Sequence, residues 1–179
     1  MGAKSHHWPM ATLTVGSYPR SGNHYLVHLL RDLVPSLGVH WVQHNMTLMN
    51  KSSHAVSICR RPDDCISSWL VYLSDISPDT ADASCLWYID YYSMIMQMSD
   101  RVYVASFDDL ISNSSDVITA ALKFHRLVDD EISGNIPIFD ATKHSGTLDI
   151  DAMTVAKSHV LRSAYYKSAC QMYDSLVKA

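Results

Sequence analysis

Residues 18–25, with the sequence YPRSGNHY, combine residue types that bind anions. Gly22 lets a backbone approach a ligand closely, Ser21 and Asn23 carry hydrogen-bond donors, and Arg20 carries a full positive charge. The segment follows a β-rich run and precedes a helical pattern, so the free N–H groups of a helix N-terminus would also face the anion. These residues predict a phosphate-binding loop. The alternative is an ordinary strand-to-helix turn that contains Pro and Gly.

A second candidate anion site follows another β-rich run, in the sequence ICRRPDDCISS. Arg60 stands at the end of the predicted strand and Ser68 about two turns into the helix that follows. They could contact one phosphate from two sides, with the guanidinium binding as a bidentate fork. The alternative is a surface cluster in which Arg60 or Arg61 pairs with Asp63 or Asp64, an arrangement that contributes little to stability.

The first loop differs from the phosphate loop of nucleotide kinases. After Gly16 the next glycine is Gly22, and Asn23 and His24 stand where such a kinase needs Lys followed by Ser or Thr. This departure argues against a P-loop kinase, which stays as an alternative function.

Together the two motifs resemble those of sulfotransferases that use 3′-phosphoadenosine-5′-phosphosulfate (PAPS). YPRSGNHY is similar to the Tyr-Pro-Lys-Ser-Gly-Thr-x-Trp loop that binds the 5′-phosphosulfate in that family. The spacing from Arg60 to Ser68 is that of the family's 3′-phosphate motif, Arg-Asn-Pro-x-Asp followed by Ser. The resemblance covers about residues 12–150, strong at the two motifs and thin between them. It implies that the cofactor is bound by Arg20, Ser21, Gly22, Asn23, His24, Tyr25, Arg60 and Ser68, with Tyr25 in place of an adenine-stacking Trp.

Two weaker matches extend the resemblance. The sequence SFDDL is similar to the family's Tyr-Glu-Asp-Leu segment, so Phe107 would lie against the adenine. A strand end followed by acidic residues at a helix start explains the same residues. The family's basic loop, which closes over the 3′-phosphate, has one candidate here in Lys143, His144 and Gly146, although the family's Arg and Trp are absent.

Sulfuryl transfer needs a base for the acceptor proton and positive charge on the leaving oxygen. His44 is similar in position to the His of the family's Lys-Thr-His, and the resemblance implies an in-line transfer with His44 as general base. Among ten histidines, a structural role for His44 is the alternative, and His24 and His40 are reserve candidates. Arg20 would stabilise the leaving group but could not donate a proton, because guanidinium stays protonated in proteins.

The composition argues against several classes of partner. The 14 Lys and Arg against 18 Asp and Glu give a net charge of −4, which argues against nucleic-acid binding through bulk charge. The four cysteines form no CxxC pair, which predicts neither a zinc site nor a disulfide framework. No run reaches the roughly 18 apolar residues of a membrane span, and the N-terminal sequence lacks the apolar core of a signal peptide. We therefore expect a cytoplasmic protein without a metal or a membrane partner.

The predicted activity is the transfer of a sulfuryl group from PAPS to a hydroxyl or amine on a small molecule, leaving adenosine 3′,5′-bisphosphate (PAP). Two other functions stay open, a P-loop-type nucleotide kinase and a non-catalytic PAP-binding protein. The helical stretch over residues 81–98, rich in Tyr and Met, either lines an acceptor pocket or packs in the core.

The elements that must position these residues alternate between β-rich and helical runs. This order predicts one α/β domain over residues 1–179, with residues 1–10 flexible and a largely parallel sheet flanked by helices. The resemblance implies a P-loop-like sulfotransferase fold. Residues 77–79 are predicted as a turn, and residues 129–150 as an aperiodic segment. We expect strands over residues 12–17, 39–43, 54–59 and 102–106, and helices over 24–34, 62–73, 81–98, 117–127 and 154–177.

Overall fold

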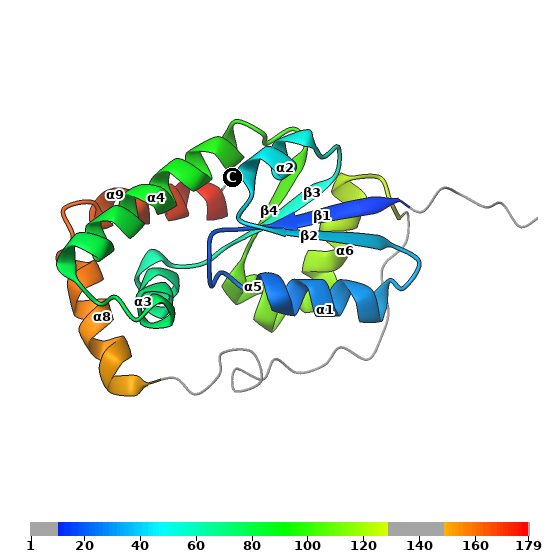
Figure 1. The fold of residues 1–179 in the computed structure, drawn as a ribbon. Coiled ribbons are helices and arrows are strands. Elements are labelled where there is room, and N and C mark those ends of the chain that lie inside the picture. The colour runs from blue at the N-terminus through cyan, green and yellow to red at the C-terminus, as the bar shows by residue number, and fades with distance from the viewer. Residues whose placement is uncertain (1–10, 129–148, 179) are drawn as a thin grey trace, which may run out of the picture.

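A four-stranded parallel sheet lies at the centre of the computed structural model, which describes residues 11–128 and 149–178 (Figure 1). The strand order is β2-β1-β3-β4. The strands are β1 (Thr12–Gly16), β2 (Gly38–Gln43), β3 (Ala55–Cys59) and β4 (Val102–Ser106). All five residues of β3 are buried, as expected for an inner strand of a sheet covered on both faces. The predicted parallel sheet is confirmed.

Helices cover both faces of this sheet (Figure 1). In β3, Val56 and Ile58 face the layer of α1, α5 and α6, whereas Ala55 and Cys59 face the layer of α4 and α9. Because successive side chains of a strand point to opposite faces, each face of the sheet has its own hydrophobic core. No helix in the described ranges is long and apolar enough to cross a membrane. The helices are α1 (Asn23–Leu33), α2 (Met46–Lys51), α3 (Pro62–Leu73), α4 (Pro78–Met96), α5 (Phe107–Ser112), α6 (Ser114–Phe124), α8 (Ile150–Arg162) and α9 (Tyr166–Val177).

Several helix boundaries differ from the predictions. The predicted turn over residues 77–79 is wrong: Ser77 is the N-cap of α4, where its Oγ accepts a hydrogen bond from Thr80 N–H at 3.2 Å, and Pro78 occupies the first turn. The single helix predicted over 154–177 is wrong as well. The non-helical backbone of Ser163, with φ −57° and ψ 136°, ends α8 there, and α9 begins three residues later.

The short helices α2 and α5 were not predicted, because six residues are too few to show a helical periodicity. A hydrogen bond to the N-cap residue stabilises the start of each of these helices instead. Asn45 accepts a hydrogen bond from Leu48 N–H at 3.1 Å, and Ser106 accepts one from Asp109 N–H at 3.0 Å.

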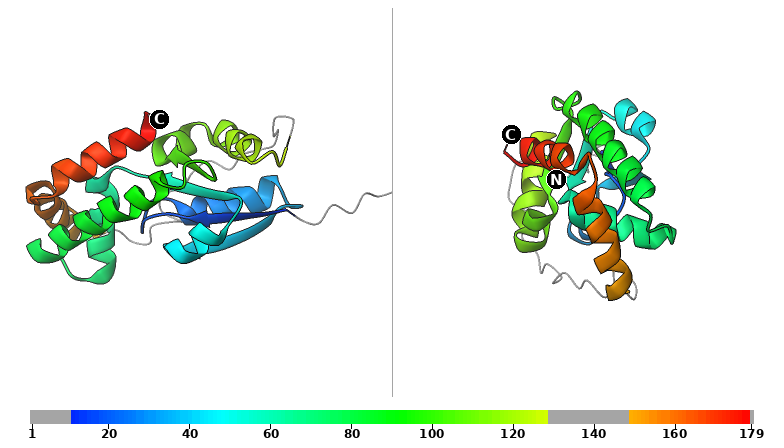
Figure 2. Two further views of the ribbon diagram at one scale, coloured as in Figure 1. Left: turned by 90° about the horizontal axis from the view of Figure 1, so that it is seen from above. Right: turned by 90° about the vertical axis from the view of Figure 1, so that its left-hand side faces the viewer.

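The chain order creates a crevice between β1 and β3. From β1 the chain passes through α1 to β2 on one side, while β3 lies on the other side, and such a reversal opens a space at the carboxyl ends of the strands. β1 pairs with β3 at only two positions, Thr14↔Ala55 and Val15↔Val56. Beyond them the strands part. Helices α3 and α8 pack together beyond these strand ends, and α4 and α9 lie side by side over one face (Figure 2).

Candidate active site

A pocket of about 430 Å³ lies at the carboxyl ends of β1, β2 and β3. Both predicted anion loops and the segment after β2 contribute side chains to it, although they are far apart in the sequence. Lys143, His144 and Gly146 lie outside the described residues, and Ser21 does not line the pocket. The sequence-predicted residues that line it are Arg20, Gly22, Asn23, His24, Tyr25, His44, Arg60, Ser68 and Phe107.

The loop after β1 has an unusual backbone. Arg20 has a φ of 61° and Gly22 a φ of 107°, both in the left-handed region. A Cβ on Gly22 would lie 2.6 Å from Cδ2 of Phe107, so only glycine fits between the start of α1 and this ring. Left-handed backbone at a non-glycine residue such as Arg20 is costly and is concentrated at functional sites.

The two polar residues beside Gly22 attach the loop to the rest of the molecule. Ser21 is fully buried, its N–H donates to the Tyr18 carbonyl at 3.3 Å, and its Oγ lies 3.4 Å from the Tyr92 hydroxyl. Asn23 Nδ2 donates to the Ser17 carbonyl at 3.4 Å. Ser21 therefore supports the loop from the core side.

Direct contacts join the two anion loops. Arg20 Nε donates to Ser68 Oγ at 3.0 Å, and Arg60 Nη1 donates to the Arg20 carbonyl at 3.3 Å. Burial, reinforced by the charge of Arg60, lowers the pKa of Arg20, which still keeps its proton. No carboxylate of the described residues lines the pocket. Two cationic side chains thus meet in a half-buried space to which the described residues contribute no negative charge, and an anion would stabilise this arrangement.

The structure separates Arg60 from its neighbour Arg61. Arg61 Nε lies 3.3 Å from Asp63, and Lys157 Nζ lies 2.9 Å from Asp63 and 3.0 Å from Asp64. The predicted surface cluster therefore involves Arg61, and it extends to α8 through Lys157. The acidic residues of this loop have other partners, and Arg60 faces the pocket.

Phe107 supports Arg60. The guanidinium carbon of Arg60 lies 4.7 Å from the centre of the Phe107 ring, within the range of a cation–π contact. Gly22 packs closely against the same ring. The sequence-based expectation was a contact of Phe107 with adenine, and in the structure the ring lies between the two loops.

His44 follows β2 directly after Gln43, which has a φ of 56°. Its ring lies 5.9 Å from that of Trp87 and 6.1 Å from that of Trp69. Burial lowers the pKa of His44, and the backbone of Ser17 acts weakly in the opposite direction. His44 is therefore neutral at neutral pH and can accept a proton. Of the two reserve histidines, His24 lines the pocket with its ring 4.2 Å from that of Trp41, whereas His40 does not line it.

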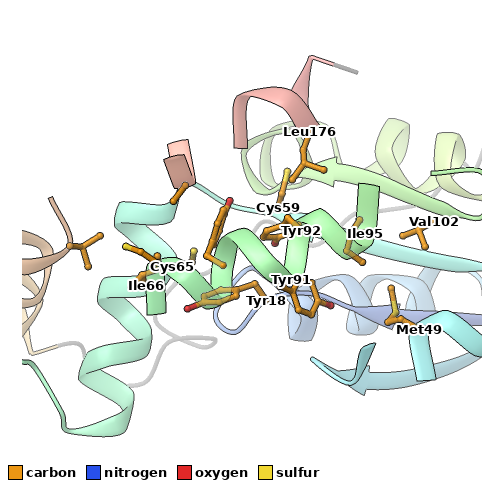
Figure 3. Packing of buried hydrophobic residues seen from close by; sticks show 14 of the residues in the cluster. Tyr18, Met49, Cys59, Cys65, Ile66, Tyr91, Tyr92, Ile95, Val102 and Leu176 are labelled. Atoms are coloured by element: carbon orange, nitrogen blue, oxygen red, sulfur yellow. The ribbon is translucent and has the colours of Figure 1, made fainter. Parts of the chain in front are cut away.

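Three aromatic residues of the pocket were not predicted. Trp41, Trp69 and Tyr72 line the pocket, and the rings of Trp69 and Tyr72 stack at 5.4 Å with an interplanar angle of 18°. The available signal was the spacing of three residues between Trp69 and Tyr72 in α3, which places them on one face. By contrast, the tyrosines of α4 follow the core alternative: Tyr88, Tyr91 and Tyr92 are fully buried, whereas Met94 and Met96 are exposed. Figure 3 shows Tyr91 and Tyr92 in this core.

In the ranges 11–128 and 149–178, no group of three or more His, Cys, Asp or Glu side chains gathers as metal ligands would. The expectation of a reaction without a metal stays a prediction.

No protein-family model matches the sequence, and no curated protein matches it. The sulfotransferase domain from the Synechococcus PCC 7002 olefin synthase resembles the chain with a TM-score of 0.54, 12% identity and coverage of 98% of both chains. The mouse sulfotransferase SULT7A1, solved in complex with PAP, has a TM-score of 0.47 and 15% identity over 83% of this chain and 63% of its own. The first likeness shows that the chain has the fold of sulfotransferase domains, which confirms the predicted fold class.

Proposed function

We propose that this chain is a sulfotransferase that moves a sulfuryl group from PAPS to a hydroxyl acceptor. One observation carries the proposal: Arg20 of the first motif donates to Ser68 of the second at 3.0 Å, so the two motifs form one cationic pocket. From their resemblance to the family's motifs, we interpret the first motif as the 5′-phosphosulfate site and the second as the 3′-phosphate site. The fold is compatible with that interpretation.

Each residue of the pocket has its own role in the proposed reaction. Arg60 and Ser68 bind the 3′-phosphate, and the loop around Gly22 binds the 5′-phosphosulfate. The acceptor oxygen forms a bond to sulfur while the bond between sulfur and the 5′-phosphate oxygen breaks. Arg20 stabilises the charge that develops on this leaving oxygen, which as a phosphate needs no proton. The acceptor proton goes to His44, and PAP leaves.

The aromatic residues of the lining indicate the kind of acceptor. Trp41, Trp69 and Tyr72 line the pocket together with His44, and the Trp69 ring lies 6.1 Å from that of His44. An ammonium group would find no carboxylate among the described lining residues, although the aromatic faces alone attract cations weakly. We therefore propose a flat acceptor with an uncharged hydroxyl group, and rank amines below it.

A ligand-binding comparison tests the anion pocket. PAP should raise the melting temperature without magnesium, because a protein is stabilised by any ligand that binds only its folded state. ATP with magnesium is the comparison ligand for the alternative kinase function. Stronger stabilisation by ATP with magnesium than by PAP would contradict the proposal and favour the kinase. PAP binding without transfer to any of a panel of phenols, alcohols, sugars and amines would favour the non-catalytic PAP-binding protein.

Replacing His44 tests the base. His44→Ala should reduce the transfer rate by about 10²–10⁴-fold and leave PAP affinity near that of the wild type, since a base acts on the transition state. The wild-type rate should fall as the pH drops through a value below the ordinary histidine pKa of about 6.5, because burial lowers the pKa of His44. An aliphatic alcohol is the right acceptor for this assay, since an acidic phenol can lose its proton unaided. A folded variant with the full rate, or with the same acid limb, would assign the role to another residue such as His24.

A further inference from the structure

Two buried tyrosines of α4 form hydrogen bonds with the backbone that leads into the second anion loop. The Tyr88 hydroxyl donates to the Arg60 carbonyl at 2.9 Å, and the Tyr92 hydroxyl donates to the Ile58 carbonyl at 2.7 Å. Both side chains are fully buried, and their rings lie 4.7 Å apart. They are four residues apart, so they share one face of the helix. Figure 3 shows Tyr92 beside Cys59, the last residue of β3.

Tyr92 also contacts the first loop, since its hydroxyl oxygen lies 3.4 Å from Ser21 Oγ. A tyrosine hydroxyl has a single proton. The Ile58 carbonyl, at 2.7 Å, is therefore its main acceptor, and the hydrogen bond from Tyr92 to Ser21 Oγ at 3.4 Å is a weaker, shared one. Tyr92 thus links the end of β3 to the first anion loop.

The hydrogen bonds of Tyr88 and Tyr92 lie where β3 stops pairing with β1. After Val56, β3 no longer pairs with β1, and the Ile58 N–H donates instead to Ser17 Oγ at 2.7 Å. The Ile58 carbonyl accepts from Tyr92, and the Arg60 carbonyl accepts from Tyr88 and, more weakly, from the Cys65 thiol at 3.7 Å. A buried backbone group without a partner is costly. Side-chain hydroxyls therefore replace the missing strand and determine where the backbone of both loops lies.

We propose that Tyr88 and Tyr92 are positioning residues for the anion pocket, an inference that rests on the proposed function. Tyr88 holds the Arg60 peptide, and so holds the Arg60 guanidinium at the 3′-phosphate site. Tyr92 holds both loops, and so acts on the 5′-phosphate and the 3′-phosphate sites together. Neither residue lines the pocket.

The same helix supplies a matched control. Tyr91 is also fully buried, and its ring lies 5.2 Å from that of Tyr92. Its hydroxyl lies beside that of Ser57, yet neither forms a hydrogen bond of normal geometry with any described residue. Removing the Tyr91 hydroxyl therefore alters the core without releasing either loop.

The test compares Tyr88→Phe, Tyr92→Phe and Tyr91→Phe by calorimetric titration with PAP and with adenosine 5′-monophosphate, which lacks only the 3′-phosphate. Loss of one buried hydrogen bond corresponds to about a three- to tenfold change in affinity. Tyr88→Phe should weaken PAP by this factor and leave the monophosphate within about twofold. Tyr92→Phe should weaken both ligands, and Tyr91→Phe neither.

Melting temperatures of the three variants separate positioning from ordinary core packing. Losses of PAP affinity that follow the melting temperatures, with Tyr91→Phe included, would overturn the inference. Wild-type affinity in Tyr88→Phe would overturn it as well, while leaving the proposed function intact. If Tyr88→Phe does not fold, Tyr92→Phe decides alone: an unchanged affinity for either ligand overturns the inference. A wild-type chain that fails to bind PAP would instead contradict the proposed function itself.

Discussion

The loop after β1 has a left-handed backbone at two residues, whereas the loop after β3 leads into its helix with an ordinary backbone. In the first loop, the left-handed Arg20 and Gly22 bring the chain against the Phe107 ring. In the second, Pro62 begins an ordinary helix, and the side chains of Arg60 and Ser68 face the pocket. Because the first loop depends on its backbone conformation, it should be sensitive to a single methyl group added at Gly22. The second loop depends on the charge of Arg60 and should tolerate changes at neighbouring residues that face away from the pocket.

The largest effect should come from the backbone of the first loop. Gly22→Ala combines a left-handed residue with a Cβ at 2.6 Å from Phe107, so the free energy of unfolding should fall by about 2–5 kcal/mol. Gly38→Ala is the matched control, since Gly38 is not among the residues with positive φ and its nearest new contact is Thr12 Oγ1 at 3.0 Å. We expect a loss below about 1 kcal/mol there. Equal losses in urea unfolding would contradict a special backbone requirement in the first loop.

The next effect concerns charge in the second loop. Arg60→Ala should weaken PAP by about 1.5–3 kcal/mol, roughly ten- to a hundredfold, and should weaken adenosine 5′-monophosphate much less. Arg61→Ala is the control, because Arg61 carries the same charge one residue further and pairs with Asp63 outside the pocket. It should change PAP affinity by less than about threefold. Equal losses in the two variants would mean that only the net charge of the loop matters.

The smallest effect concerns the acidic cluster behind the second loop. Burial raises the pKa of Asp63, but the hydrogen bonds and charges of Lys157 and Arg61 outweigh it and leave the pKa below its ordinary value. The ion pairs therefore stabilise the folded state above the unfolded-state pKa of about 3.9, and this contribution is lost as the pH falls through the folded-state pKa. Lys157→Met should lower the free energy of unfolding at pH 7 by roughly 1 kcal/mol, since Lys157 is partly exposed. In this variant the free energy of unfolding should also fall less steeply as the pH becomes acidic. A fall as steep as that of the wild type would mean that other carboxylates cause it.

Local patterns were sufficient for most of the elements near the site. The alternation of β-rich and helical runs predicted the four strands of the parallel sheet, and Pro62 correctly marked the start of α3. The same patterns missed the break at Ser163, because the residues on both sides of it form helices and no Gly or Pro marks the end of α8. Proline at a helix start also explains the error at Pro78, since a turn and an N-terminal helical residue use the same backbone angle.

The sequence by itself determined the residue types and the order of two candidate anion loops, because glycine, arginine and proline at strand-to-helix junctions have strong local preferences. Only the tertiary structure decided which of the two adjacent arginines faces the pocket, since Arg61 is held outside by Asp63 on its own helix, next to Lys157 from α8. It also decided that Ser21 faces Tyr92, and that Trp41 lines the same pocket as Trp69 and Tyr72. The contacts of Lys157 with Asp63 and of Tyr92 with Ser21 join residues that are far apart in the chain, and their geometry follows from the order of strands and the packing of helices on the sheet.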